Sequence, residues 1–116
     1  MLYTEILNNN RDFLALYRKG KFTASKNIVI YVRKNNLPFN RLGITAGKKI
    51  GNAVHRNRAK RLIRQAYREN ELAMPVGIDI VIVARASLCS VKPTELSQYM
   101  KKYGIPEIYR LLFDSH

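Results

Sequence analysis

One segment decides the fold of this 116-residue chain: residues 53–70, which read AVHRNRAKRLIRQAYREN. Its apolar residues recur at the i, i+3, i+4, i+7, i+8 spacing of one helix face. They are Ala59, Leu62, Ile63, Ala66 and Tyr67. The segment therefore predicts a long amphipathic helix, and Asn52, directly before it, is a residue type that caps helix N-termini.

The side of this helix opposite the apolar face is basic. Arg58, Lys60, Arg61, Arg64 and Arg68 fall there, with Asn57 among them. Like charges four residues apart destabilise an isolated helix by about 0.2–0.5 kcal/mol per pair. No carboxylate lies on this helix before Glu69 to relieve the repulsion. The planar fork of arginine suits phosphate better than the point charge of lysine does. The pattern predicts a face that binds nucleic acid, and a merely solvated surface helix is the alternative.

Apolar segments on both sides of this helix predict a sheet. Residues 78–84, IDIVIVA, are typical of a central buried strand, and residues 42–46 predict a strand before the helix. Further strands are expected at residues 22–25 and 28–33.

Two more helices complete the expected order. They are predicted at residues 8–19 and 93–103, with Gly20 and Gly104 marking their ends. The order α-β-β-β-α-β-α predicts a single α/β domain over residues 1–116, a two-layer sandwich with a mainly antiparallel or mixed sheet.

The charge is large and unevenly distributed. The chain carries a net charge of +13, and 15 of its 21 Lys and Arg residues lie between Phe13 and Arg68, where there is no acidic residue. Such an excess repels itself unless a polyanion neutralises it, so nucleic acid or an anionic membrane surface is the expected partner. Lys48 and Lys49, followed by Ile50-Gly51-Asn52 and a helix N-terminus, form a natural site for sulfate or phosphate anions.

Several function classes are disfavoured by composition. Cys89 has no partner for a disulfide, and with only His55 and His116 for company it cannot build a zinc site. The eight acidic residues are scattered, whereas a metal-dependent nuclease gathers carboxylates around two cations about 4 Å apart. No apolar run suits a membrane span, and residues 1–10 lack the order of a signal peptide, so a cytoplasmic protein without membrane contact is expected.

Three successive segments carry a family resemblance. Arg41-Leu42-Gly43-Ile44-Thr45 is followed by KKIGNAV at residues 48–54 and by RNRAKRLIR at residues 56–64. Together they resemble the protein subunit of bacterial ribonuclease P, whose signature is a Lys-Lys-x-Gly-Asn-Ala-Val segment running into an Arg-Asn-Arg-x-x-Lys-Arg-x-x-Arg helix. Asp12-Phe13, Tyr17, Gly20, Tyr31 and Ile82-Val83-Ala84-Arg85 follow the same order, so the resemblance covers roughly residues 11–103.

The resemblance implies a fold and a mechanism. The fold would be that of the second domain of ribosomal protein S5, with a left-handed strand–helix–strand crossover. The protein would have no catalytic residue and hold no cofactor by itself, because the RNA subunit binds Mg²⁺ and removes the 5′ leader of precursor tRNA. The protein would bind that catalytic RNA and the single-stranded leader.

The resemblance also assigns residues, together with the basic helix face. The expected contacts to the catalytic RNA are Lys48, Lys49, Asn52, Arg56, Asn57, Arg58, Lys60, Arg61, Arg64 and Arg68. The expected leader cleft contains Arg11, Phe13, Tyr17 and Tyr31, since aromatic rings beside a basic groove stack the bases of single-stranded RNA. Gly47 stands where the family usually has Ser, and Asn8-Asn9-Asn10 replaces most of a basic N-terminal arm.

Some assignments stay open at the level of sequence. Phe13 and Tyr17 have helical spacing that also fits packing on the sheet, and Phe22 fits the core or the rim of the cleft equally well. His55 is expected at the core boundary, Asp79 at an exposed strand start, and Cys89 in an inert loop. A ribosomal or assembly RNA-binding protein and a DNA-coating protein are the competing functions.

Overall fold

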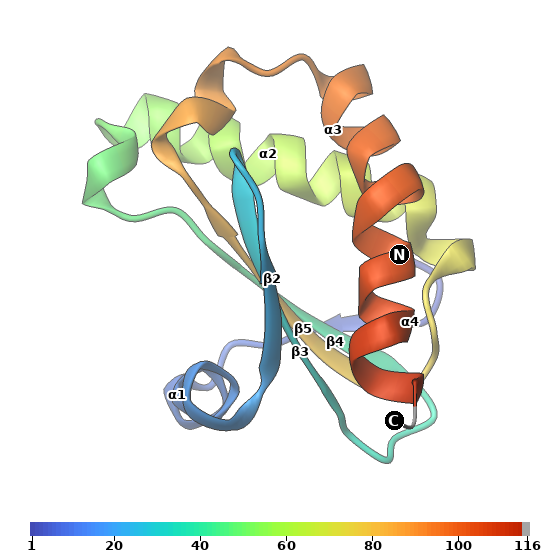
Figure 1. Ribbon diagram of the computed structural model, residues 1–116. Helices are drawn as coiled ribbons and strands as arrows, with labels where there is room; N and C mark the ends of the chain where they lie inside the picture. Colours follow the sequence, from blue (N-terminus) through green and yellow to red (C-terminus); the bar gives the residue numbers. More distant parts are fainter. Residues whose placement is uncertain (115–116) are drawn as a thin grey trace.

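The computed structural model describes residues 1–114 and contains one five-stranded sheet (Figure 1). Its strands are β1 (Thr4–Ile6), β2 (Lys21–Ala24), β3 (Ile28–Lys34), β4 (Asn40–Thr45) and β5 (Ile78–Ala84). They lie in the order β1-β4-β5-β3-β2. β4 pairs in parallel with β1 and β5, whereas β3 pairs antiparallel with β5 and β2. The predicted mixed sheet is confirmed.

The helices are α1 (Asn10–Lys19), α2 (Ala53–Asn70), α3 (Pro93–Tyr99) and α4 (Ile105–Phe113). α2, α3 and α4 cover one face of the sheet, while α1 lies against the other (Figure 1). α2 connects the parallel neighbours β4 and β5, which is the crossover that the resemblance expects to be left-handed. Short helical turns η1 (Lys48–Ile50), η2 (Glu71–Ala73), η3 (Ala86–Ser90) and η4 (Met100–Gly104) fill connections, and none of the described helices is long and apolar enough to span a membrane.

The main core lies between the sheet and α2, α3 and α4. Ile30 and Val32 of β3 and Ile80 of β5 are fully buried on this face. The entire predicted apolar stripe of α2 is buried against them: Ala59, Leu62, Ile63, Ala66 and Tyr67. Burial of each large side chain stabilises the fold by about 1.5–3 kcal/mol, so this face explains why the helix forms where the sequence predicts it.

The N-terminal strand β1 was not predicted. It pairs with β4, and the residues at its start are held by Glu71. The Glu71 carboxylate accepts hydrogen bonds from the backbone N–H of Leu2 at 2.8 Å, that of Tyr3 at 3.3 Å, and the Thr4 hydroxyl at 2.5 Å. Burial alone would raise the pKa of Glu71, but these bonds outweigh it and hold the pKa below its usual value. Three residues paired at such a sequence distance leave no local pattern to detect.

Two predicted helix ends differ from the structure. Gly104 does not end the last helix, because the chain continues through η4 into α4. Gly104 is buried instead, and a Cβ on it would lie 3.3 Å from Met100 Sδ and 3.6 Å from Ile30 Cδ1. It is a small residue at a helix–sheet contact. α1 begins at Asn10 rather than residue 8, since the Asn9 side chain accepts a hydrogen bond from the N–H of Arg11 at 2.8 Å and caps the helix.

The region around the start of α2 also corrects two expectations. His55 is exposed rather than at the core boundary, because the buried side of α2 begins only at Ala59. The expected loop around Cys89 is the helical turn η3, and the Cys89 thiol lies 3.6 Å from the carbonyl oxygen of His55.

Candidate nucleic-acid interface

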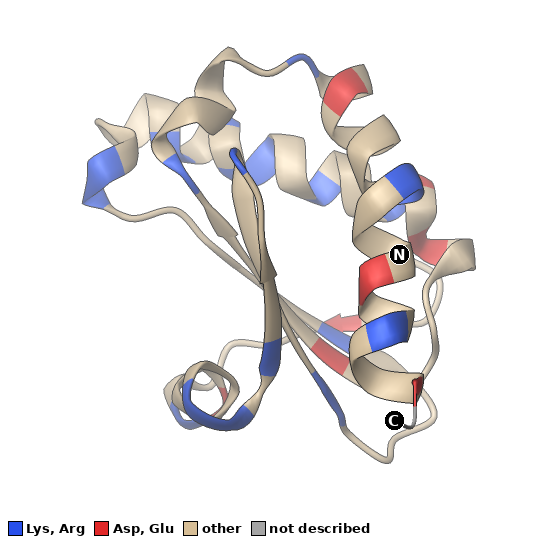
Figure 2. Ribbon diagram, viewed as in Figure 1, with Lys and Arg blue, Asp and Glu red and all other residues tan. Residues whose placement is uncertain are grey.

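The solvent side of α2 forms a basic ridge, which we define as Asn57, Lys60, Arg61, Arg64 and Arg68. All but the half-buried Lys60 are exposed, and the first four line a shallow concavity of about 320 Å³. Figure 2 shows basic positions repeating along α2. Within residues 1–114, no Lys or Arg of α2 forms an ion pair with a carboxylate. The ridge therefore presents positive charge that the described part of the chain leaves uncompensated.

The Arg56-Asn57-Arg58 motif adjoins this ridge. Arg58 lines a second depression together with Arg61 of the ridge, Gln65 and Pro93 at the start of α3, and Arg56 is half-buried. Asn52 caps α2, its side-chain oxygen accepting a hydrogen bond from the N–H of His55 at 3.1 Å. The motif thus adds basic residues to the first turns of α2, next to the ridge.

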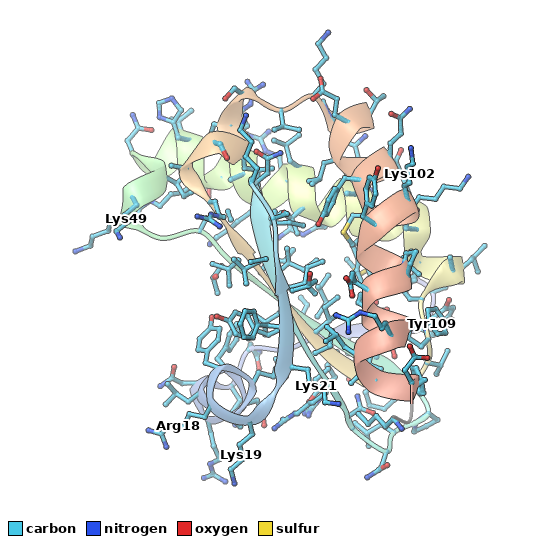
Figure 3. The ribbon with its side chains drawn as sticks, in the orientation of Figure 1. Arg18, Lys19, Lys21, Lys49, Lys102 and Tyr109 are labelled. Atoms are coloured by element: carbon cyan, nitrogen blue, oxygen red, sulfur yellow. The ribbon has the colours of Figure 1, made fainter. Side chains whose placement is uncertain are left out.

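Lys48 and Lys49 lie in a different basic region, the loop groove. This groove has a volume of about 770 Å³ and is lined by Gly47, Lys48, Lys49, Lys26 and Arg85, with Val83 of β5 as part of its floor. Lys49 projects outward from the end of the molecule in Figure 3. Sequence reasoning did not select Lys26 or Arg85, because they come from the β2–β3 turn and the end of β5, segments that carry no basic cluster of their own.

Four aromatic rings cluster between α1 and the sheet, where the sequence predicts the leader cleft: Phe13, Tyr17, Phe22 and Tyr31. We call this cluster the aromatic cleft. Tyr17 meets Tyr31 edge-on with ring centres 5.0 Å apart, and Phe22 lies 5.7 Å from Tyr31. Phe13 lies 6.4 Å from Tyr17. Tyr17 is 39% exposed and Phe22 58% exposed, so Phe22 lies at the rim and not in the core. Arg11, in the first turn of α1, is exposed.

A buried charge network lies beside these rings. Asp79 was expected at an exposed strand start, yet it is 0% exposed. Its carboxylate accepts hydrogen bonds from Arg41 at 2.7 Å, Arg33 at 2.9 Å and the Asn35 side chain at 2.9 Å. Burial acts to raise the pKa of Asp79, but these donors outweigh it and lower the pKa. The hydrogen bond from Arg41 to Asp79 in turn raises the pKa of Arg41.

The fold and its exposed basic surfaces define an α/β protein suited to binding a polyanion such as nucleic acid. The sequence profile of the family described as Ribonuclease P matches residues 1–104. The ribonuclease P protein component of Lachnoclostridium phytofermentans is 48% identical over 94 residues, covering 81% of each chain, and that of Clostridioides difficile is 45% identical over 85 residues, covering 72% of this chain and 75% of the other.

Solved structures agree with this match. The RNase P protein of Staphylococcus aureus superposes with a TM-score of 0.77 at 29% identity, covering 91% of this chain and 95% of the other. The RNase P protein of Thermotoga maritima gives 0.65 at 32% identity, with 92% and 90% covered. The chain belongs to the ribonuclease P protein family. It is the accessory protein subunit of that tRNA-processing ribonuclease, and the RNA subunit of the enzyme is its partner.

Proposed function

We propose that this subunit uses opposite faces of its sheet for two RNA ligands. The basic ridge, with Arg56, Arg58, Asn52 and the Lys48-Lys49 pair, binds the catalytic RNA. The aromatic cleft, with Arg11, binds the single-stranded 5′ leader of precursor tRNA. The observation that carries this proposal is the separation of the two surfaces, since α2 packs on one face of the sheet and α1 on the other.

Electrostatics support the assignment of the ridge to a large folded RNA. Its arginines lie on successive turns of one straight helix, and a rigid row of guanidinium groups can contact several phosphates at once. Because the described residues leave these groups without carboxylate partners, binding RNA breaks no ion pair of theirs. The loop groove is a second concave basic surface where phosphate or sulfate anions would bind.

The aromatic cleft suits an unpaired strand. A base in a duplex already has both faces stacked, whereas a leader base can stack on an exposed ring, which is worth about 1–3 kcal/mol per base. Tyr17 and Phe22 offer such partly exposed rings, and Tyr31 supports both from below.

The chemistry of cleavage falls to the RNA in this proposal. Among residues 1–114, no three His, Cys, Asp or Glu side chains lie close enough together to bind a metal ion. The Mg²⁺ ions of the reaction would be bound by the catalytic RNA and the substrate. The protein would contribute binding and orientation of the leader.

Two substitutions test the division of surfaces. Arg64→Ala should weaken binding of the catalytic RNA more than Tyr17→Ala does. Tyr17→Ala should instead reduce the preference of the holoenzyme for leader-bearing precursor over mature tRNA by about 5- to 100-fold. Arg64→Lys and Tyr17→Phe are the matched controls, since they retain the charge and the ring. Equal defects of Arg64→Ala and Tyr17→Ala on both ligands would contradict the proposal.

A further inference from the structure

Three charged side chains form a row across the three central strands, near one end of the sheet. Arg33, Asp79 and Arg41 occupy directly paired positions on β3, β5 and β4. They share the face that carries α1. The single buried carboxylate of Asp79 accepts bonds from both guanidinium groups. Two positive charges on these strands therefore meet one buried negative charge, while the next position of the row, Glu5 of β1, is exposed.

Asp12 of α1 supplies a second carboxylate that pairs with both arginines. Its two carboxylate oxygens lie 3.2 Å from Arg33 Nη2 and 3.6 Å from Arg41 Nη1. Asp12 thus spans both arginines from the helix side while Asp79 spans them from the sheet side. Arg33 and Arg41 are about 70% buried, so these pairs are better shielded from water than the exposed Arg110–Glu107 pair of α4.

The next row on the same face forms the floor of the aromatic cleft. Phe22, Tyr31, Val81 and Gly43 are paired across β2, β3, β5 and β4. The ring of Phe13 lies over Gly43, where a Cβ would come within 2.6 Å of the ring. Two successive residues of α1 therefore contact two successive rows of the sheet, Asp12 the charged row and Phe13 the aromatic row.

We propose that Asp12 is a positioning residue for leader binding, fixing the first turn of α1 on Arg33 and Arg41 so that Phe13 lies over Gly43 and the cleft keeps its width. This inference rests on the proposed role of the aromatic cleft. It goes beyond that role because Asp12 pairs with two arginines and is not one of the four rings, and because it assigns leader affinity to a carboxylate in an RNA-binding protein.

A substitution at Asp12 distinguishes a role in positioning α1 from a general loss of folding better than one at Asp79 does. Asp79 is wholly buried between three donors, and its removal would leave two arginines without a counter-charge inside the fold. Asp12 is 24% exposed and contacts the row from outside. Asp12→Asn keeps the shape of the side chain and removes its charge, so the sheet should stay intact while α1 loosens.

The test uses Asp12→Asn, Asp12→Glu and the control Glu107→Gln, which removes an exposed ion pair on α4. Each protein is assembled with the catalytic RNA, and binding of precursor tRNA is compared with binding of mature tRNA. NOEs between the Phe13 ring and the Gly43 Hα in the free protein report the position of α1. Tyr17→Ala is measured in parallel to show that the cleft binds the leader.

For Asp12→Asn we expect the leader-dependent part of the affinity to fall by about fivefold, with weaker NOEs and unchanged binding of mature tRNA. Asp12→Glu should restore part of both signals, and Glu107→Gln should change neither. Full leader affinity in Asp12→Asn beside a clear defect in Tyr17→Ala would overturn the role of Asp12 alone. No defect in Tyr17→Ala would overturn the proposed role of the cleft and this inference with it.

Discussion

The ring of Phe13 fills the space that a Cβ on Gly43 would need. That Cβ would lie 2.6 Å from Cζ and 2.8 Å from Cε1 of the ring, closer than real Cβ contacts allow. β4 therefore has glycine at this position because α1 comes this close to the sheet, and the position of the Phe13 ring depends on a missing side chain. The contact joins a residue of the proposed leader site to the central strands.

Gly43→Ala should push Phe13 out of its place and destabilise the protein by about 1–3 kcal/mol, as overpacking does. Urea denaturation measures this loss. In Phe13→Leu the smaller side chain leaves room for the added methyl group, so the double variant should be more stable than the two separate losses predict. Strict additivity of the two substitutions would show that the ring and the glycine are not coupled.

Stability should fall in acid because two buried carboxylates have lowered pKa values in the fold, Glu71 and Asp79. The unfolded chain takes up these protons at higher pH than the folded chain does. The contribution of these two carboxylates to the free energy of unfolding is therefore largest above the ordinary carboxylate range near pH 4. It decreases as the pH falls through the lowered pKa values. Urea denaturation between pH 6 and pH 2.5 measures the slope.

Glu71→Gln isolates one of the two groups. This variant should be less stable than the parent at neutral pH, because a buried amide accepts fewer of the bonds from Leu2, Tyr3 and Thr4. It should also lose stability less steeply in acid, since one titrating carboxylate is gone. Parallel pH profiles for the two proteins would rule out Glu71 as a source of the acid sensitivity.

Salt dependence tests the basic ridge. Affinity for the catalytic RNA should fall steeply with salt, the slope of log affinity against log salt being about 0.7–0.9 for each phosphate contact. Arg64→Ala should reduce that slope by about one contact, whereas Arg64→Lys should preserve it. Titrations at several salt concentrations measure the slope. A flat profile for the parent protein would contradict phosphate binding by the ridge.

Gly47→Ser tests the loop groove, because Gly47 stands where the resemblance leads one to expect serine. Its backbone is extended, with φ −79° and ψ −179°, and a Cβ there would meet no atom within 4 Å. The substitution should therefore leave the melting temperature unchanged and add a hydroxyl beside Lys48, raising affinity for RNA by up to about tenfold. A loss of stability would contradict the open geometry of the loop, and weaker RNA binding would contradict a contact there.

The elements predicted best from sequence are those whose periodicity arises from burial on one face. The structure gives α2 and β5 the predicted bounds, residues 53–70 and 78–84, because the apolar stripe of α2 packs directly on the sheet. His55 continues that stripe in sequence yet is exposed, since α2 begins before its packed region. The periodicity of a sequence shows which side of a helix is apolar, but it does not show where the elements packed against that side end.

Long-range polar contacts account for what the sequence could not predict. β1 pairs with the distant β4 and begins beside Glu71, and the burial of Asp79 depends on arginines from two other strands. A lone Asp in an apolar strand next to arginine-bearing strands is a usable signal for such a network, although the register must be known first. The same holds for the cleft, where Phe22 joins Tyr31 only through strand pairing, and for Lys26 and Arg85, which meet Lys48 only in three dimensions.

The most direct test of the account is cleavage of precursor tRNA at low Mg²⁺ by three preparations: the catalytic RNA alone, the protein alone, and the two together. We predict slow cleavage by the RNA, none by the protein, and strong stimulation on mixing that depends on the leader and is reduced by Tyr17→Ala. Cleavage by the protein alone, or a mixture no faster than the RNA by itself, would contradict it.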